Sequence, residues 1–496
     1  MFKIGAVTAA VVIPGIAALF YFAAPHFPDF SSQVVSSDRI VVRAGQDLQK
    51  ALDSAKPGDT ILVQAGASFK GNFKLRKKRG TGVITIRSSA SDDQLPKEGE
   101  RIDPTVYAPV LPKLSSPNSE AVVSTEAGAH GFRFVGVEFQ STKGGFSNII
   151  QIGTSEEETV ADIPTDIEFD RVYIHATDPA GQRRGIAANG RRILIRNSHI
   201  SGIRRKGEES QAIAMWGADG PVEIRNNYLE AAAENILFGG ASSTLKLVPT
   251  SCVVEGNTLN KPVSWRNEGW VVKNIFEIKN GKNIVVRNNV MTNNWVMGQE
   301  GTAILFTVRE DNGPATIIED ILFENNVVRG TSSAVNVWGG EGGGGRNLTI
   351  RNNLFADVDH KKWGGRGFFL KASEWDGLKI ENNTIINSGN VAIAYGKPIQ
   401  NFVFANNIVF YNDYGISGDD TSPGQEAISV YFPGARIVHN AIIGARQGVA
   451  GNPNYYLSSS SQIGFADQKD FRLSPSSPYR SKGTNGRGIG YQPTQQ

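Results

Sequence analysis

Three charged side chains in the middle of the chain have the types and the spacing for acid–base chemistry. Glu277 and Lys279 alternate with apolar residues in the segment IFEIKN, and Arg309 ends the next alternating segment, ILFTVRE. Alternation is typical of a β-strand with one buried face, so Glu277 and Lys279 are predicted to point outward together. A lysine whose pKa is lowered by burial and by nearby cations can accept a proton, and an arginine beside it can neutralise a carboxylate. These residues therefore predict proton removal beside a carboxylate, followed by β-elimination.

Glu277 has other roles open to it. It could orient Lys279, or it could help to hold Ca²⁺ with Glu268 or Glu300, and Ca²⁺ is the one cofactor that the sequence suggests. Alternatively, Glu277 and Lys279 form a surface ion pair along one strand, which requires no function. The histidines show no spacing typical of a metal site, so none is predicted to be a ligand.

Aromatic and polar residues recur at the equivalent position of neighbouring strands. Parallel strands lie about 4.8 Å apart, so a column of seven such positions spans roughly 30 Å. Aromatic rings stack on sugars and cations meet carboxylates, so this column predicts binding of an extended acidic polysaccharide. The segments IAMWG, ILFGG, FEIKN, ILFTV, VNVWG, FFLKA and IAYGK align into an outward column of Trp216, Gly239, Lys279, Thr307, Trp338, Lys371 and Tyr395, and the column two residues earlier reads Ala214, Leu237, Glu277, Leu305, Asn336 and Phe369. The predicted substrate-binding residues are Trp216, Trp338, Lys371, Asn336, Thr307 and Tyr395.

The same columns argue against a glycoside hydrolase. That reaction needs two carboxylates about 5 to 9.5 Å apart, which in a coil stack means one or two coils apart in one column. Glu277 has Leu237 and Leu305 at one coil, and Ala214 and Asn336 at two. A lyase is therefore the favoured enzyme.

A repeat marked by asparagine-bearing corners positions these strands. Each corner follows an alternating strand such as VEIR or LTIR, at a spacing of roughly 24 to 37 residues, which is typical of a solenoid. Asparagine tolerates left-handed backbone, and stacked amides can bond from coil to coil. The pattern predicts an all-β solenoid over residues 38–455, with a C-terminal strand and irregular cap over 456–496. The corners lie at 196–198, 226–227, 256–257, 288–289, 325–326, 352–353, 382–383, 406–407 and 439–440.

The start of this solenoid resembles a known fold family. Residues 39–66, RIVVRAGQDLQKALDSAKPGDTILVQAG, combine a strand, an amphipathic helix over 46–55, a Pro-Gly-Asp turn and a second strand. This order resembles the amino-terminal entry of the pectate-lyase-like superfamily, which implies a single-stranded right-handed parallel β-helix with an N-terminal capping helix.

Lys279 and Arg309, on consecutive coils, also resemble the lysine and arginine arrangement of the chondroitin B and alginate lyase family. That resemblance implies a polysaccharide lyase. The chain departs from the family pattern at Val272 and Asn274, where the family has paired acidic Ca²⁺ ligands, and at Asn280, where it has a serine.

The first residues bear on location. The run from Ile4 to Ala24 carries no charge, and about 20 apolar residues suffice to span a bilayer. Residues 1–24 are predicted to be a membrane anchor or a signal peptide, and residues 25–37 a linker. Either interpretation exports the rest of the chain, which would be periplasmic, cell-surface or secreted, with the N-terminal segment as the contact with the membrane.

Charge and cysteine content narrow the class further. The net charge is only +3, so no nucleic-acid partner is predicted. A single cysteine, Cys252, excludes an intrachain disulfide framework. The leading hypothesis is an exported β-helix protein that binds an acidic polysaccharide and, as a further step, cleaves it by β-elimination. The alternative is a non-catalytic β-helix that serves as an adhesin or envelope scaffold.

Overall fold

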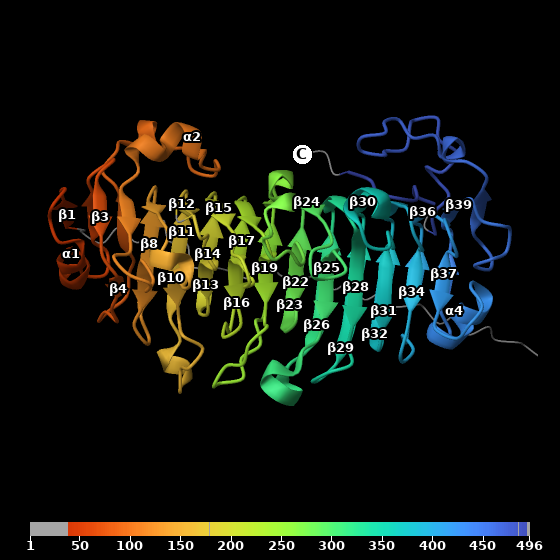
Figure 1. The fold of residues 1–496 in the computed structure, drawn as a ribbon, viewed down its shortest axis with the longest axis horizontal. Coiled ribbons are helices and arrows are strands. Elements are labelled where there is room, and N and C mark those ends of the chain that lie inside the picture. The colour runs from red at the N-terminus through yellow and green to blue at the C-terminus, as the bar shows by residue number, and fades with distance from the viewer. Residues whose placement is uncertain (1–37, 178, 485, 494–496) are drawn as a thin grey trace, which may run out of the picture.

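The computed structural model describes residues 38–177, 179–484 and 486–493, and these form one long stack of coils (Figure 1). Successive coils in the described part of the chain contribute strands to three parallel sheets, called A, B and C in the order in which the chain passes through them, with 14, 14 and 12 strands. The fold is a single-stranded right-handed parallel β-helix, as predicted. Sheet A contains β1 (Arg39–Val42), β2 (Thr60–Val63), β5 (Ile84–Ser88), β8 (His130–Val135), β11 (Thr165–Asp170), β14 (Arg191–Arg196), β17 (Val222–Arg225), β20 (Val253–Glu255), β23 (Gly281–Arg287), β26 (Ile318–Glu324), β29 (Gly345–Arg351), β32 (Trp375–Glu381), β35 (Val403–Ala405) and β38 (Arg436–Val438).

The other two sheets follow the same order along the stack. Sheet B contains β3 (Ser68–Lys70), β6 (Lys113–Ser115), β9 (Glu138–Phe139), β12 (Tyr173–His175), β15 (His199–Ile203), β18 (Tyr228–Ala231), β21 (Thr258–Asn260), β24 (Val290–Asn294), β27 (Val327–Thr331), β30 (Leu354–Val358), β33 (Thr384–Asn387), β36 (Ile408–Phe410), β39 (Ala441–Ile443) and β40 (Tyr455–Leu457). Sheet C contains β4 (Phe73–Leu75), β7 (Val123–Thr125), β10 (Asn148–Ile152), β13 (Arg184–Ala188), β16 (Gln211–Met215), β19 (Glu234–Phe238), β22 (Phe276–Ile278), β25 (Thr302–Thr307), β28 (Ser333–Trp338), β31 (Leu370–Ser373), β34 (Ala392–Ala394) and β37 (Ile416–Gly418).

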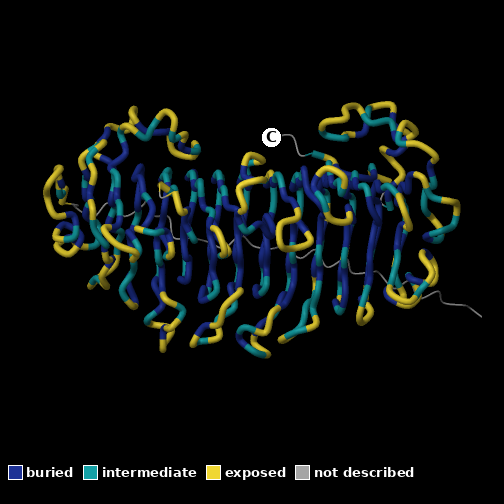
Figure 2. Tube along the Cα trace, in the orientation of Figure 1, coloured by how far each residue is buried: buried dark blue, intermediate teal, exposed yellow. Residues whose placement is uncertain are grey.

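The core fills the inside of the coils, where the strands are buried while the connecting loops are exposed (Figure 2). The inward residues predicted from alternation, Phe276, Ile278, Ile304 and Phe306, are all fully buried. Rings of successive coils meet, since the centroid of Phe276 lies 6.5 Å from that of Phe306. Burial of one such side chain stabilises the fold by about 1.5–3 kcal/mol, and the stack repeats this contribution coil after coil.

The corner between sheets A and B carries the predicted asparagine ladder. Its first residue has left-handed backbone, as in Asn288 at φ 58°. Its second residue points inward, and the backbone N–H of Asn257 donates to Oδ1 of Asn289 at 2.9 Å while that of Asn289 donates to Asn326 at 3.0 Å. The side-chain amide of Asn289 also donates to the carbonyl of Val254 at 3.0 Å. The ladder satisfies backbone groups that the turn would otherwise leave unpaired. It runs through Ser198, Asn227, Asn257, Asn289, Asn326, Asn353, Asn383, Asn407, Asn440 and Asn454.

A lysine takes a similar position inside the corner between sheets B and C. Lys261 is fully buried, and its Nζ donates to the carbonyls of Ala231 and Ala233 at 3.1 and 2.8 Å and to Oδ1 of Asn235 at 3.1 Å. Burial lowers the pKa of this amine to about 7, against the opposing effect of Glu234.

We expect this lysine to make stability depend on pH. Between about pH 7 and the ordinary lysine pKa of about 10.4, the unfolded chain binds a proton that the folded chain lacks, so the free energy of unfolding rises with pH. Lys261→Met removes this group. The free energy of unfolding of the wild type, minus that of Lys261→Met, should therefore increase by on the order of 3 kcal/mol between pH 7 and 9.5. Urea unfolding at both pH values measures this difference. An advantage independent of pH would contradict the assignment.

A short helix covers the first coil, as predicted. Helix α1 (Leu48–Ser54) begins after Asp47, whose carboxylate caps it by accepting from the N–H of Lys50 at 3.1 Å. Leu48 and Leu52 are buried. The helix is slightly shorter than the predicted 46–55. The remaining helices are α2 (Pro104–Tyr107), α3 (His360–Trp363) and α4 (Gln425–Tyr431).

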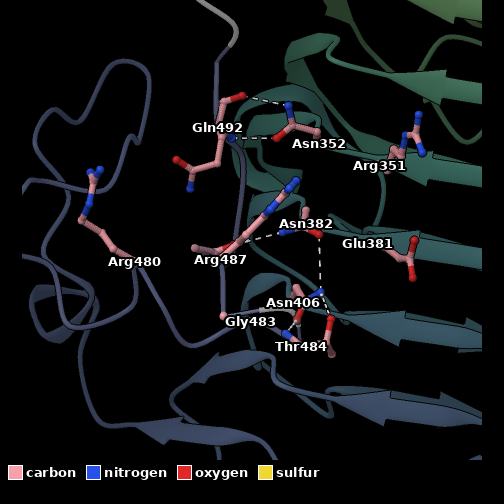
Figure 3. A pocket seen from close by; sticks show the side chains of 12 residues that line it. Arg351, Asn352, Glu381, Asn382, Asn406, Arg480, Gly483, Thr484, Arg487 and Gln492 are labelled. Carbon is pink, nitrogen blue, oxygen red and sulfur yellow. Dashed lines mark hydrogen bonds between the residues drawn. The ribbon is translucent and has the colours of Figure 1, made fainter.

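Two segments arch over the asparagine corners from opposite ends of the stack (Figure 1). Near the amino end, the guanidinium of Arg101 donates to the carbonyls of Asn226 and Gly256 and to the hydroxyl of Thr258, at 2.9 to 3.1 Å. The C-terminal segment does the same at the other end, where Gln492 and Asn352 exchange hydrogen bonds of 2.7 and 2.8 Å (Figure 3). A cavity of about 690 Å³ remains beneath it.

No helix in the described part of the chain has the length and apolarity needed to cross a bilayer. The predicted anchor or signal peptide (1–24) and the predicted linker (25–37) lie outside the described residues.

Candidate functional site

The outward face of sheet C, from β19 to β34, brings most of the predicted residues together. Leu237 pairs with Glu277, Glu277 with Leu305, and Leu305 with Asn336, so this predicted column has the correct register. Adjacent strands also pair Thr307 with Trp338 in the other column. The side chains predicted to share one stripe therefore do so over these coils.

Lys371 is one exception, because it lies in the column of Asn336 and not in that of Trp338. The register pairs Asn336 with Lys371 and Trp338 with Ser373. The alignment failed because Phe369, predicted to point outward, is fully buried at the turn before β31. The strand therefore starts later than the motif FFLKA suggests. Lys371 still points outward on the same face.

Glu277 and Lys279 lie together, with Glu277 on the protein side. Glu277 is only 2% exposed and accepts hydrogen bonds from the amide of Asn274 at 2.9 Å and the hydroxyl of Thr307 at 3.4 Å. The Nζ of Lys279 lies 3.9 Å from its carboxylate. Glu277 can therefore orient Lys279, whose amine is the more accessible of the two groups.

Arg309 lies beside Lys279 on the next coil. Its backbone N–H donates to the carbonyl of Lys279 at 3.4 Å. Its guanidinium lies over the ring of Trp338, 4.7 Å from the centroid, and 3.4 Å from the carboxylate of Glu341. The guanidinium of Arg309 is thus positioned by the ring of Trp338, which belongs to this face, and by the carboxylate of Glu341 from the loop after β28.

A second cation–aromatic pair lies further along the same face. The Nζ of Lys371 is 5.4 Å from the ring centroid of Tyr395. It also donates to both carboxylate oxygens of Glu300, at 3.0 and 2.9 Å. Burial raises the pKa of the Tyr395 hydroxyl, with a smaller contribution from the charge of Glu300.

Trp216, which directly follows β16, extends this face one coil towards the amino end. The guanidinium of Arg184 lies over its ring at 5.0 Å, and its indole N–H donates to the hydroxyl of Ser155 at 2.9 Å. Burial, followed by the charge of Arg183, lowers the pKa of Arg184 to about 10. The ring is therefore held by protein groups on one face and at its edge.

A buried ion pair that the sequence pattern does not predict lies beneath this face. Glu234, on the coil before Glu277, is fully buried, accepts from Gln211 at 2.8 Å and lies 3.1 Å from the Nζ of Lys273. Burial raises the pKa of the Glu234 carboxyl. Burial lowers the pKa of Lys273, but the carboxylates of Glu234, Glu277 and Glu209 outweigh that effect and raise it.

Glu234 lies outside the column of Glu277, in which the register places Ala214, Leu237, Leu305 and Asn336, as predicted. The alignment of outward columns does not include Glu234, because the two residues after it, Asn235 and Ile236, both face inward at a corner of the coil. The alternation of inward and outward residues is interrupted there. Glu234 is paired with Lys273 and lacks exposure, so it supports the face from below and cannot reach a substrate.

The carboxylates suggested for Ca²⁺ do not fit a shared ion. Glu277 is held by Asn274 and Thr307, Glu268 pairs with Arg204 at 3.0 Å, and Glu300 pairs with Lys371. In the part of the chain that the structure describes, no group of three His, Cys, Asp or Glu side chains converges. Among the described residues, Glu277, Glu268 and Glu300 are therefore not brought together as the suggested Ca²⁺ ligands.

The outward face of sheet A has a different character. Its charged side chains form ion pairs from coil to coil. The guanidinium of Arg287 lies 2.7 Å from the carboxylate of Glu255, and that of Arg351 lies 2.8 Å from the carboxylate of Glu324. Glu319 is held by both Lys282 and Arg346 at 2.7 Å. Such neutralised ladders are typical of a solvated structural face, whereas aromatic rings interleave with the cations on sheet C.

Comparisons with known proteins agree with this architecture. The family model described as "Right handed beta helix region" matches residues 211–408. A PL6 family alginate lyase, AlyGC, superposes with a TM-score of 0.58 at 17% identity, covering 92% of this chain and 57% of that chain. The chain therefore spans less than two thirds of that enzyme's length.

Two further solved structures superpose less well. A mannuronic acid specific family 6 lyase from human gut microbiota gives a TM-score of 0.42 at 10% identity, covering 84% of this chain and 82% of that chain. The pectate lyase Pel9A superposes with a TM-score of 0.40 at 13% identity, covering 92% of this chain and 95% of that chain. A comparison with curated proteins finds no match. At 17% identity the likeness to AlyGC shows the fold alone, and the chain is a right-handed parallel β-helix protein.

Proposed function

We propose that the outward face of sheet C binds an acidic polysaccharide and that Lys279 and Arg309 cleave it by β-elimination. The observation that carries this proposal is the position of the two cations. They lie side by side on adjacent coils of one face, with Glu277 beneath the amine at 3.9 Å and the ring of Trp338 beneath the guanidinium at 4.7 Å.

The reaction assigns one task to each group. The guanidinium of Arg309 neutralises the sugar carboxylate, which makes the proton on the adjoining carbon more acidic. The amine of Lys279 takes that proton, the electron pair of the broken C–H bond forms a carbon–carbon double bond, and the glycosidic oxygen on the next carbon leaves. The resulting ammonium returns a proton to the leaving oxygen, so the products are an unsaturated uronate end and a new free hydroxyl.

The rest of the face suits a long polymer. Trp216, Trp338 and Tyr395 offer ring faces or edges at intervals along the stack, and Lys371 adds a further cation. A polymer of this kind is met outside the cell, so the proposal includes export, which depends on the predicted role of residues 1–24.

A non-catalytic function is the second candidate, and one observation favours it. Both cations already have carboxylate partners, Glu277 for Lys279 and Glu341 for Arg309. A face with paired cations and rings can recognise a polysaccharide without activating a base, as an adhesin or envelope scaffold would.

One assay separates the two candidates. The purified protein is incubated with alginate, pectate and glycosaminoglycans, with and without Ca²⁺, and the absorbance of unsaturated uronates is followed. A lyase gives a rising signal with at least one polymer. Binding without such a signal favours the recognition function, and neither binding nor product would overturn both.

A further inference from the structure

A carboxylate of the protein itself already lies against a cation of the proposed binding face. Glu300 belongs to the loop before β25, and its carboxylate receives two hydrogen bonds from Lys371, which lies two coils further along on β31. Glu300 is about half exposed, whereas the side chain of Lys371 is mostly covered. The loop is anchored through its main chain, since the carbonyl of Glu300 accepts from the hydroxyl of Ser332 at 3.0 Å. The carboxylate can therefore leave Lys371 without unfolding the loop.

The surroundings of Lys371 hold polar atoms that have no protein partner in the described part of the chain. Oδ1 of Asn336, the register neighbour of Lys371, is buried and unbonded. The hydroxyl of Ser373, in the adjoining column, is also unbonded, but this residue is fully buried and, like Glu234, cannot reach a sugar. Buried polar atoms are almost always paired, so Oδ1 of Asn336 points to a ligand that supplies its partner.

We infer that Lys371, Asn336 and Tyr395 form a second carboxylate subsite for an acidic sugar, which Glu300 occupies as an internal substitute until the polymer displaces it. This inference rests on the proposed binding function of sheet C. The sugar carboxylate takes the two hydrogen bonds that Glu300 now receives, a hydroxyl of the same sugar donates to Oδ1 of Asn336, and the ring of Tyr395 covers one side.

The position of the subsite indicates what kind of polymer fits. Arg309 follows β25 and Lys371 lies on β31, two coils or about 10 Å away along the stack. Arg309 also lies further along the strand direction than Lys371, which is in register with Leu305. The face therefore recognises a carboxylate at Arg309 and a further one at Lys371. A polymer that carries carboxylates only at wide intervals cannot engage both cations.

Removal of the internal carboxylate tests the inference. Glu300→Gln keeps the size of the side chain but removes the charge that competes for Lys371. We expect this variant to bind an acidic oligosaccharide about tenfold more tightly than the wild type in calorimetry. The probes are alginate, pectate and hyaluronan oligosaccharides. Glu319→Gln removes a carboxylate held by two cations on sheet A and is the matched control, with unchanged affinity expected.

The double variant Glu300→Gln/Lys371→Met completes the test. This variant should not show the increased affinity of Glu300→Gln, because it lacks the cation that would bind the sugar carboxylate. An affinity of Glu300→Gln equal to or below that of the wild type would overturn the subsite, as would a gain that persists without Lys371. If Glu300→Gln binds the oligosaccharide more tightly but neither the wild type nor the variant releases unsaturated uronate, the subsite is supported and the proposed lyase activity is contradicted.

Discussion

Replacement of Lys279 by alanine is expected to lower the rate of uronate release by about 10³-fold, with much less effect on affinity for the polymer. A positioned base typically contributes 10²- to 10⁴-fold to a proton transfer, and no other amine lies against Glu277 on this face among the ion pairs of the described residues. The loss should appear in kcat, because the remaining rings and cations still hold the substrate. Absorbance of unsaturated uronates under saturating polymer measures it.

Lys282 provides the matched control for this change. It lies three residues further along the chain but belongs to sheet A, where its amine pairs with Glu319 at 2.7 Å. Lys282→Ala should leave the rate within about twofold of the wild type, as expected for an exposed surface pair. If Lys279→Ala were as active as Lys282→Ala, the site would lie elsewhere on the molecule.

The largest effect on stability is expected from Lys273→Met. This change leaves Glu234 fully buried without the cation that lies 3.1 Å away, and loss of one partner of a buried ion pair typically costs about 3–5 kcal/mol. Chemical unfolding, or hydrogen exchange in β16 to β22, measures the loss. Lys282→Met, which breaks an exposed pair, should cost less than about 1 kcal/mol.

The loss of stability in Lys273→Met should depend on pH and on the presence of Glu234. Burial raises the pKa of this carboxyl above its unfolded value, so its neutral form stabilises the fold at low pH and that contribution is lost as pH rises. The deficit of Lys273→Met should therefore be smaller at pH 5 than at pH 8. Glu234→Gln/Lys273→Met should recover part of it. An equal deficit at both pH values, or no recovery, would contradict the buried pair.

The fold could be predicted because its signals repeat. Asn288 and Asn289 play the same two roles as their equivalents in other coils, one with left-handed backbone and one inside the ladder. Alternation placed Phe276 and Glu277 on the correct sides, because β-strands have a period of two residues.

The candidate site was less predictable, because its details depart from the repeat. Lys371 was assigned to the wrong column, since Phe369 turns inward at a corner and shifts the start of the strand. Glu234 was missed because a corner of two inward residues precedes Leu237. Glu300 and Glu341 reach the cations from loops of irregular length, which carry no periodic signal.

If an acidic polysaccharide lies along the outward face of sheet C, a crystal structure of Lys279→Ala with a bound acidic oligosaccharide should show it there. We expect a chain of sugars running across β22 to β34, with one carboxylate against Arg309 and a sugar ring against Trp338. An oligosaccharide bound on the outward face of sheet A, or beneath the C-terminal segment near Asn352, with sheet C left empty, would contradict it.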